Sequence, residues 1–300
     1  MVARRQRGRY RPAMRFSGRT IWITGASSGI GEALAGAFAA EGAALILSGR
    51  RRDALETLAA RLGGESLVLP FEATDRNAMA GAAAAAWAWR AGGVDILVNN
   101  AGISQRSLAI DTAPEVYERI VAVDLLAPIR LTQSLLPLMA ARGNGHVVMI
   151  SSVAGRLGPV LRTAYAAAKH GLIGYGDALR AEVETAYAIK VTNVLPGSVR
   201  TQVAANALQG DGSARGTSDA NIEAGMDPAE CARRILDGLA EGRREILVAD
   251  GAEAFAASLR FRDPDRLFDL LAAEGARLAE ARAGGAPPEP RRVNRILPER

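Results

Sequence analysis

A tyrosine and a lysine stand four positions apart in the stretch YAAAK, and a helix would place Tyr165 and Lys169 on one face. Lys169 is one of only two lysines in a chain with 35 arginines, which makes its position informative. Ser152 lies thirteen residues before Tyr165, directly after a short apolar run. A phenol is a poor base because its ordinary pKa is about 10, but a neighbouring ammonium favours the phenolate. These three residues predict a site at which a tyrosine exchanges a proton with a small molecule.

A glycine-rich turn follows the first apolar run of the chain. Its glycines are spaced as GxxxGxG instead of GxGxxG, and its residues are Thr24, Gly25, Ala26, Ser27, Ser28, Gly29, Ile30 and Gly31. Between a strand and a helix, backbone N–H groups and the helix dipole attract a phosphate, and glycine lets the backbone approach it closely. The turn therefore predicts a site for the pyrophosphate of a dinucleotide, although a tight strand-to-helix turn would also use glycine.

The end of the second apolar run bears on which dinucleotide would bind. An acidic residue there would accept hydrogen bonds from the ribose hydroxyls of NAD. The sequence instead continues as LSGRRR over residues 47–52, with no acid. A guanidinium group suits a ribose 2′-phosphate, so NADP(H) is favoured over NAD(H), with Arg50 as the first candidate and Arg51 as the second. The other interpretation is a solvated run of charges at a helix start.

Apolar runs alternate with helical patterns over residues 19–250, and these elements must bring the chemical groups together. Strands are expected at 20–24, 44–48, 66–71, 95–98, 146–150, 190–195 and 245–248. Helices are expected near 29–41, 52–62, 76–91, 114–142 and 163–186. Strands of continuous apolar residues separated by helices indicate a parallel sheet covered on both faces. With right-handed crossovers, the prediction is an α/β class protein with a doubly wound, mainly parallel sheet, the three-layer α/β/α Rossmann fold.

The chain divides into one domain and its flanking segments. Residues 1–14 are basic and aperiodic and are expected to form a disordered arm. The single Rossmann domain covers 15–250 and includes an aperiodic stretch, 205–221, that is typical of a lid over a binding site. Residues 251–283 are expected to form a helical extension, with Leu267, Phe268, Leu271 and Leu278 at helical spacing, and 284–300 a flexible, proline-rich tail.

Composition excludes several classes of protein. With 49% hydrophobic and 23% charged residues, the chain is not disordered throughout. Without the six arginines of residues 1–15 the formal charge is −1, so no nucleic-acid partner is expected. A single cysteine excludes an intramolecular disulfide and a multi-cysteine metal site, and no metal is expected. Because the sequence has no secretory signal and no apolar run of roughly 20 residues, we expect a cytoplasmic protein with no membrane partner.

Five motifs occur in the order in which the short-chain dehydrogenase/reductase family carries them: TGASSGIG, NNAG, ISS, YAAAK and PGSVRT. The chain resembles the shorter, single-domain branch of that family over about residues 15–250. The resemblance implies an oxidoreductase that interconverts a carbonyl and a secondary alcohol by hydride transfer. In family terms Tyr165 would be the general acid/base, Ser152 would polarise the substrate oxygen, and Lys169 would bind the nicotinamide ribose and favour the phenolate.

The resemblance also implies the rest of the cofactor site and the assembly. Beside Tyr165, Lys169 and the glycine-rich turn (Gly25, Ser27, Ser28, Gly29, Ile30, Gly31), the cofactor would meet Asn99, Ala101, Gly102, Pro196, Gly197, Val199 and Thr201. The partner would be a small-molecule carbonyl or alcohol under the lid. Family members assemble as homodimers or homotetramers through the long helices, here 114–142 and 163–186.

Two positions depart from the family pattern. Asp124 stands in the middle of the long fourth helix, where Asn is usual in a proton relay to the lysine. The carboxylate is nearly isosteric, but it loses donors and adds a charge near Lys169, so we expect the activity to survive with an altered pH profile. Glu72 stands after the third strand where Asp usually meets the adenine amino group, and it is long enough to reach that group.

Two other functions fit the same fold. A non-catalytic protein that senses NAD(P) would explain Asp124 but not the intact Ser152, Tyr165 and Lys169. An epimerase or dehydratase of the extended branch would need a larger second domain and a different glycine spacing. A serine hydrolase is set aside because the chain has no GxSxG motif.

Overall fold

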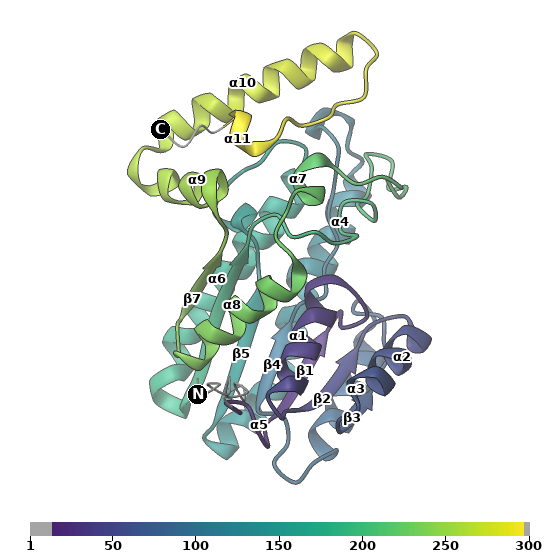
Figure 1. The fold of residues 1–300 in the computed structure, drawn as a ribbon, viewed down its shortest axis with the longest axis vertical. Coiled ribbons are helices and arrows are strands. Elements are labelled where there is room, and N and C mark those ends of the chain that lie inside the picture. Colours follow the sequence, from purple (N-terminus) through teal and green to yellow (C-terminus); the bar gives the residue numbers. More distant parts are fainter. Residues whose placement is uncertain (1–13, 297–300) are drawn as a thin grey trace, which may run out of the picture.

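The computed structural model describes residues 14–296, in which seven parallel strands form one sheet in the order β3-β2-β1-β4-β5-β6-β7 (Figure 1). The strands are β1 (Thr20–Thr24), β2 (Ala44–Ser48), β3 (Ser66–Val68), β4 (Ile96–Asn99), β5 (Gly145–Ile150), β6 (Ile189–Pro196) and β7 (Glu245–Val248). The strand order reverses between β1 and β4, and ligands of open α/β sheets bind at such a reversal, outside the carboxyl ends of the strands. The predicted doubly wound Rossmann fold is confirmed.

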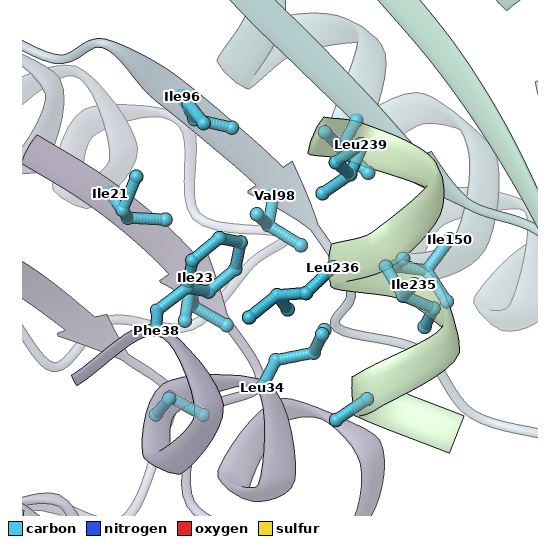
Figure 2. Close-up of a cluster of buried hydrophobic side chains, with 14 of the residues drawn as sticks. Ile21, Ile23, Leu34, Phe38, Ile96, Val98, Ile150, Ile235, Leu236 and Leu239 are labelled. Atoms are coloured by element: carbon cyan, nitrogen blue, oxygen red, sulfur yellow. The ribbon is translucent and has the colours of Figure 1, made fainter. Parts of the chain in front are cut away.

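Two layers of helices cover the sheet. One layer contains α1 (Gly29–Ala40), α2 (Arg52–Leu62) and α8 (Pro228–Ala240); the other contains α3 (Arg76–Ala88), α5 (Ala127–Arg142) and α6 (Thr163–Tyr187). Successive side chains of β1 point to opposite faces of the sheet and pack against both helix layers. Ile21 and Ile23 pack toward α1 and α8, and Trp22 packs toward α3 and α5. Figure 2 shows Leu34 and Phe38 of α1 meeting the strand residues. Burying each such side chain stabilises the fold by about 1.5–3 kcal/mol.

The expected helix over 114–142 is not a uniform α-helix. It consists of α4 (Pro114–Val121), a π-helical turn η2 (Ala122–Leu126) and α5. The π turn inserts one extra residue per turn, and it aims the Asp124 side chain inward, where that side chain is fully buried. By length and composition alone the stretch Pro114–Arg142 could cross a membrane; 39% of its most apolar window is buried within the protein, and the buried face of α5 packs on the sheet.

The lid, residues 205–221, has little regular structure but is tied to the segment that follows β4. Leu208 donates its backbone N–H to the Ser104 carbonyl (2.8 Å), and Arg106 donates to the Leu208 carbonyl (2.9 Å). The lid ends at α7 (Ala220–Glu223), whose N-terminus Asp219 caps. Short 3₁₀ turns η1 (Ala109–Asp111) and η3 (Val153–Gly155) complete this end of the domain.

The C-terminal extension is a pair of helices, α9 (Gly251–Arg262) and α10 (Pro264–Ala283), where the sequence pattern predicts one. Pro264 cannot continue α9, and Asp263 caps α10 through the Arg266 N–H. Leu267 and Leu278 are buried as expected, whereas Phe268 is half-exposed. In Figure 1 the extension lies beside the lid at the top of the molecule.

Residues 284–296, for which the sequence predicts a flexible tail, have little regular structure before residue 293. This segment folds back on α10, ends in α11 (Val293–Ile296), and donates the Arg291 N–H to the Glu274 carboxylate (2.9 Å). Val293 donates its N–H to the Asn221 side chain (2.8 Å), so the tail also contacts α7. The basic arm predicted for residues 1–14 lies almost wholly outside the described residues. The other differences are small: β3 and α3 end three residues earlier than predicted.

Candidate active site

One cleft of about 800 Å³ runs along the carboxyl ends of the strands. It extends from the glycine-rich turn and the end of β2 to the end of β5, the start of α6 and the loop after β6. All four predicted catalytic residues line it: Asp124, Ser152, Tyr165 and Lys169. The predicted cofactor residues that line it are Gly25, Ser27, Ser28, Gly29, Ile30, Arg50, Arg51, Glu72, Ala101, Gly102, Pro196, Gly197, Val199 and Thr201.

The glycine-rich turn is built for close contact with a ligand. Gly25 has φ +65°, a left-handed conformation that favours glycine, and a Cβ at Gly31 would lie 2.3 Å from the Gly25 carbonyl oxygen. Gly31 lies beneath the turn and does not line the cleft, so it serves packing rather than contact. Ser28, at the N-cap of α1, makes no side-chain capping bond, which leaves N–H donors at the helix N-terminus for a phosphate.

Two arginines stand at the adenosine end of the cleft. Arg51 donates from Nη2 to the Ser27 carbonyl oxygen (3.1 Å) and the Ser27 hydroxyl (3.2 Å), which fixes it beside the glycine-rich turn. Arg50 has a side chain 65% exposed, and its Nη1 lies 3.8 Å from the Glu72 carboxylate. Together with the phosphate donors of α1 and the length of the cleft, these residues fit a nicotinamide dinucleotide.

Ser152, Tyr165 and Lys169 meet at the other end of the cleft. The Ser152 hydroxyl accepts from the Ala154 N–H (3.1 Å) and donates to the Pro196 carbonyl (3.3 Å). Tyr165 and Lys169 are one turn apart on α6, with Lys169 Nζ 5.6 Å from the centre of the tyrosine ring. The fold thus brings Ser152, Tyr165 and Lys169 to the lining of one cleft.

Asp124 and Lys169 form a buried ion pair. Lys169 Nζ lies 3.2 Å from Asp124 Oδ2, and the side chains are 5% and 0% exposed. Asp124 Oδ1 accepts from the Ile103 N–H (2.8 Å), and Lys169 Nζ donates to the Ile150 carbonyl (3.1 Å). A Cβ at Gly102 would lie 2.9 Å from Asp124 Oδ2, so glycine is needed there for space.

Burial acts in opposite directions on the two members of this pair. It raises the pKa of Asp124, and the ammonium of Lys169 only partly opposes the shift. It would lower the pKa of Lys169, but the carboxylate of Asp124 and the nearby Tyr165 outweigh it, so that pKa is raised above its ordinary value. Lys169 is therefore held as an ammonium, which is the form that favours a neighbouring phenolate.

Asn99 does not reach the main cleft. Its side chain is buried and donates to the Thr132 hydroxyl (3.0 Å) and the Met149 sulfur (3.4 Å). Asn100 takes its place at the cleft and donates to the Thr24 carbonyl (2.9 Å), which supports the glycine-rich turn. The expectation at Asn99 is thus corrected by one position within the same NNAG motif.

Further residues line the cleft that the sequence did not predict individually, and Arg106 is one of them although the pocket was expected to include residues 103–110. Glu253 of α9 accepts from the Ser198 N–H (2.7 Å) and the Ser198 hydroxyl (2.6 Å), beside Gly197. Arg106 and Arg162 line the end of the cleft that the lid covers. No local motif marks any of the three, since each is brought to the site by contacts between distant segments.

Other reactive groups in the described part of the chain lie away from the cleft. His146 is buried on β5, hydrogen-bonded to the Thr192 hydroxyl (2.9 Å), and burial lowers its pKa to about 4. Burial raises the pKa of the Cys231 thiol to about 12, which makes it unreactive. Within residues 14–296, no group of three or more His, Cys, Asp or Glu side chains is placed to hold a metal ion.

Comparisons with known proteins agree with this geometry. A family model described as short chain dehydrogenase matches residues 19–212. Dehydrogenase/reductase SDR family member 7B from Bos taurus is 39% identical over 261 residues, 84% of this chain and 80% of that protein. A short-chain dehydrogenase from Sphingobium yanoikuyae, solved in complex with NADPH, has 29% identity and a TM-score of 0.68, with 76% of this chain and 87% of that one covered.

A short chain dehydrogenase/reductase from Burkholderia phymatum, solved in complex with NAD, is similar in fold alone. It has a TM-score of 0.73 at 21% identity, with 92% of this chain and 98% of that one covered. The family model matches most of the domain, and the bovine relative is 39% identical. These two similarities show the family as well as the fold. The chain belongs to the short-chain dehydrogenase/reductase family of oxidoreductases.

Proposed function

We propose that the protein is an NADP(H)-dependent oxidoreductase that interconverts a carbonyl and a secondary alcohol, with Tyr165 as general acid/base. The observation that carries the proposal is the position of Lys169 beside Tyr165, held as an ammonium by Asp124, in a cleft that also contains Ser152. Those groups supply what proton exchange at a carbonyl oxygen requires.

The chain's own residues bind and polarise the reactants. The glycine-rich turn and the N-terminus of α1 would hold the pyrophosphate, and the loop from Pro196 to Thr201 would border the nicotinamide. When bound, the nicotinamide supplies or accepts the hydride. In the reducing direction the Ser152 hydroxyl donates a hydrogen bond to the substrate oxygen, and Tyr165 gives that oxygen its proton. Lys169 stabilises the phenolate that remains.

Replacing Tyr165 by Phe tests the chemistry. Removing the hydroxyl should lower kcat for ketone reduction by about 10²–10⁴-fold, because general acid catalysis contributes that much. The measurement is NADPH oxidation over a panel of ketones and aldehydes, with NADPH binding followed by fluorescence and expected to be unchanged. Tyr117→Phe is the matched control, since its hydroxyl meets only the Thr163 hydroxyl outside the cleft (2.8 Å).

Full turnover by Tyr165→Phe would overturn the role of this tyrosine. A wild-type protein that binds NADPH tightly but reduces no member of a diverse panel would favour the alternative of a non-catalytic nucleotide sensor.

NADP(H) preference rests on the two arginines at the end of β2. Arg50 is exposed at the cleft and has only a long contact to Glu72, so its donors are open to a 2′-phosphate. Arg51 is already fixed against Ser27, and no acid follows β2 to accept ribose hydroxyls. The Sphingobium yanoikuyae relative, solved with NADPH, supports the same choice. A preference for NADP(H) in turn favours the reducing direction.

Arg50→Ala should weaken NADPH binding by about 10–100-fold and leave NADH binding unchanged, because a hydrogen bond to a charged group contributes about 1.5–3 kcal/mol. Fluorescence titration with both nucleotides gives the two Kd values. Arg52→Ala is the control, because Arg52 starts α2, pairs with Glu56 (3.3 Å) and does not line the cleft. Equal losses for NADPH and NADH, or tighter binding of NADH by the wild type, would contradict the assignment.

A further inference from the structure

Two arginines line the cleft on the side that the lid covers, and both face one carboxylate. Arg106 Nε donates to Asp219 Oδ2 at 2.8 Å, and Arg162 Nη2 lies 3.7 Å from the same oxygen. The side chains of Arg106, Arg162 and Asp219 are 4%, 18% and 1% exposed. Arg106 follows β4, Arg162 precedes α6 and Asp219 ends the lid, so three segments form one charged wall.

Positive charge exceeds negative charge at this wall. A third arginine, Arg215 of the lid, lies 3.8 Å from Asp219 Oδ2, and it also pairs with Glu289 (2.5 Å). Three guanidinium groups thus face two carboxylates, which leaves one positive charge unmatched. The nearby charge of Arg162 adds to burial in lowering the pKa of Arg106 to about 10, as expected for crowded cations.

Among the arginines of this wall that line the cleft, Arg162 has open donors. Its guanidinium makes no hydrogen bond to any residue of the described range 14–296; its contact with Asp219 is a long ion pair, because Arg106 already occupies that oxygen. A largely buried guanidinium with unused N–H groups is costly unless an acceptor is supplied. Its planar fork suits a carboxylate or a phosphate, which can accept two hydrogen bonds at once.

The wall lies next to the reacting groups. Arg162 is three residues before Tyr165 at the start of α6, about 4.5 Å along the helix axis. The Tyr165 hydroxyl is also near enough to Arg106 to raise its pKa electrostatically, although burial outweighs this effect. An anion held here would therefore be only a few bonds from a carbonyl that contacts Ser152 and Tyr165. The lining of the cleft also includes apolar side chains, among them Val153, Val203, Leu208 and Ile222, and polar ones, among them Ser104, Gln202 and Asn206.

We propose that Arg162, supported by Arg106, binds an anionic group of the substrate, so that the enzyme acts on ketones or aldehydes bearing a carboxylate or phosphate a few bonds from the carbonyl. The proposal rests on the proposed oxidoreductase function. Asp219 keeps Arg106 in place, and the lid that carries Asp219 completes the wall when it covers the cleft.

Two matched pairs of probes test the proposal: acetoacetate against methyl acetoacetate, and hydroxyacetone phosphate against hydroxyacetone. With NADPH, the wild type should favour the anionic member of at least one pair by tenfold or more in kcat/KM. Arg162→Leu should lose about 10–100-fold on that anion and change the neutral partner less than threefold, since a charge-assisted hydrogen bond contributes about 1.5–3 kcal/mol. Arg162→Lys should recover part of the loss. The pair that shows the preference identifies carboxylate or phosphate as the anion.

Arg233→Leu is the control, because this arginine pairs with Glu230 on the exposed face of α8, away from the cleft. Equal kcat/KM for charged and neutral members in the wild type, with no selective loss in Arg162→Leu, would overturn the anion site and leave the oxidoreductase function standing.

A binding measurement separates this proposal from turnover. The Tyr165→Phe protein loaded with NADPH should show a rise in Tm with acetoacetate or hydroxyacetone phosphate, and the rise should vanish when Arg162→Leu is added. Absence of any rise overturns the proposal even if neutral ketones are reduced. A rise that depends on Arg162 supports the anion site even if no ketone is turned over, in which case only the proposed oxidoreductase function fails.

Discussion

Asp124 and Lys169 place a carboxylate and an ammonium in the protein interior. Burying either charge alone would be unfavourable, and the two groups compensate for this by forming an ion pair. Asp124 Oδ1 is satisfied by the Ile103 N–H and its Oδ2 faces Lys169 at 3.2 Å. Removing one member of such a pair strongly destabilises the fold, because the other charge is left unpaired in a region of low dielectric. The carboxylate thus sets the protonation of the lysine that acts on Tyr165.

The sign of the pH effect follows from this pairing. Burial alone would lower the pKa of Lys169, and Asp124 is a main reason that it is raised instead. Asp124→Asn should therefore let Lys169 lose its proton at lower pH. The ammonium of Lys169 is then lost at lower pH, which moves the alkaline limb of the kcat/KM profile for ketone reduction to lower pH, by on the order of one pH unit.

A pH–rate series from pH 6 to 10 on the wild type and Asp124→Asn checks this expectation. Asp237→Asn serves as control, because Asp237 pairs with Arg15 and Arg233 at the surface. An unchanged alkaline limb in Asp124→Asn, with activity retained, would show that the carboxylate does not govern the proton exchange.

Helix α9 lies beyond the segment that the family model matches, yet it reaches the nicotinamide end of the cleft. Glu253 receives both the N–H and the hydroxyl of Ser198, so it fixes the turn that follows β6. Its approach also explains Gly197, since a Cβ there would lie 2.1 Å from Glu253 Oε2. The C-terminal extension is thereby part of the scaffold of the site.

Glu253→Ala should weaken NADPH binding by about tenfold and lower the free energy of unfolding by about 1–3 kcal/mol, because the partly buried Ser198 N–H loses its acceptor. Fluorescence titration and urea denaturation measure the two quantities. Glu253→Gln retains an acceptor oxygen and should keep most of both, which makes it the matched control. Wild-type NADPH affinity in Glu253→Ala would show that α9 does not position this turn.

At the scale of the whole molecule, short sequence patterns predicted the strands of the sheet and the residues at the strand ends. The apolar runs marked all seven strands, and motifs at strand ends marked the cleft, because parallel strands bring their carboxyl ends to one edge of the sheet. Pro264 also marks the break between α9 and α10. The sequence pattern nevertheless predicts one helix there, because the residues on both sides of Pro264 have helical spacing.

What the sequence did not reveal depends on contacts between distant residues. The π turn that buries Asp124 has no composition signal, and Arg106 and Asp219 meet across 113 residues. The tail over 284–296 has the proline and polar residues typical of a loose segment, yet acceptors on Glu274 and Asn221 hold it. Contacts of this kind cannot be predicted from any short stretch of sequence.

The order of strands has a consequence for how the chain can fold while it is being made. β1 emerges first and lies inside the sheet; β2 and β3 add on one side of it, and β4, β5, β6 and β7 add in turn on the other. Every new strand pairs with one that has already left the ribosome, but the β1 edge that receives β4 stays open until β2 and β3 have been made. The lid and Glu253 are translated late, so the nascent chain would form the glycine-rich turn before the segments that cover the far end of the cleft.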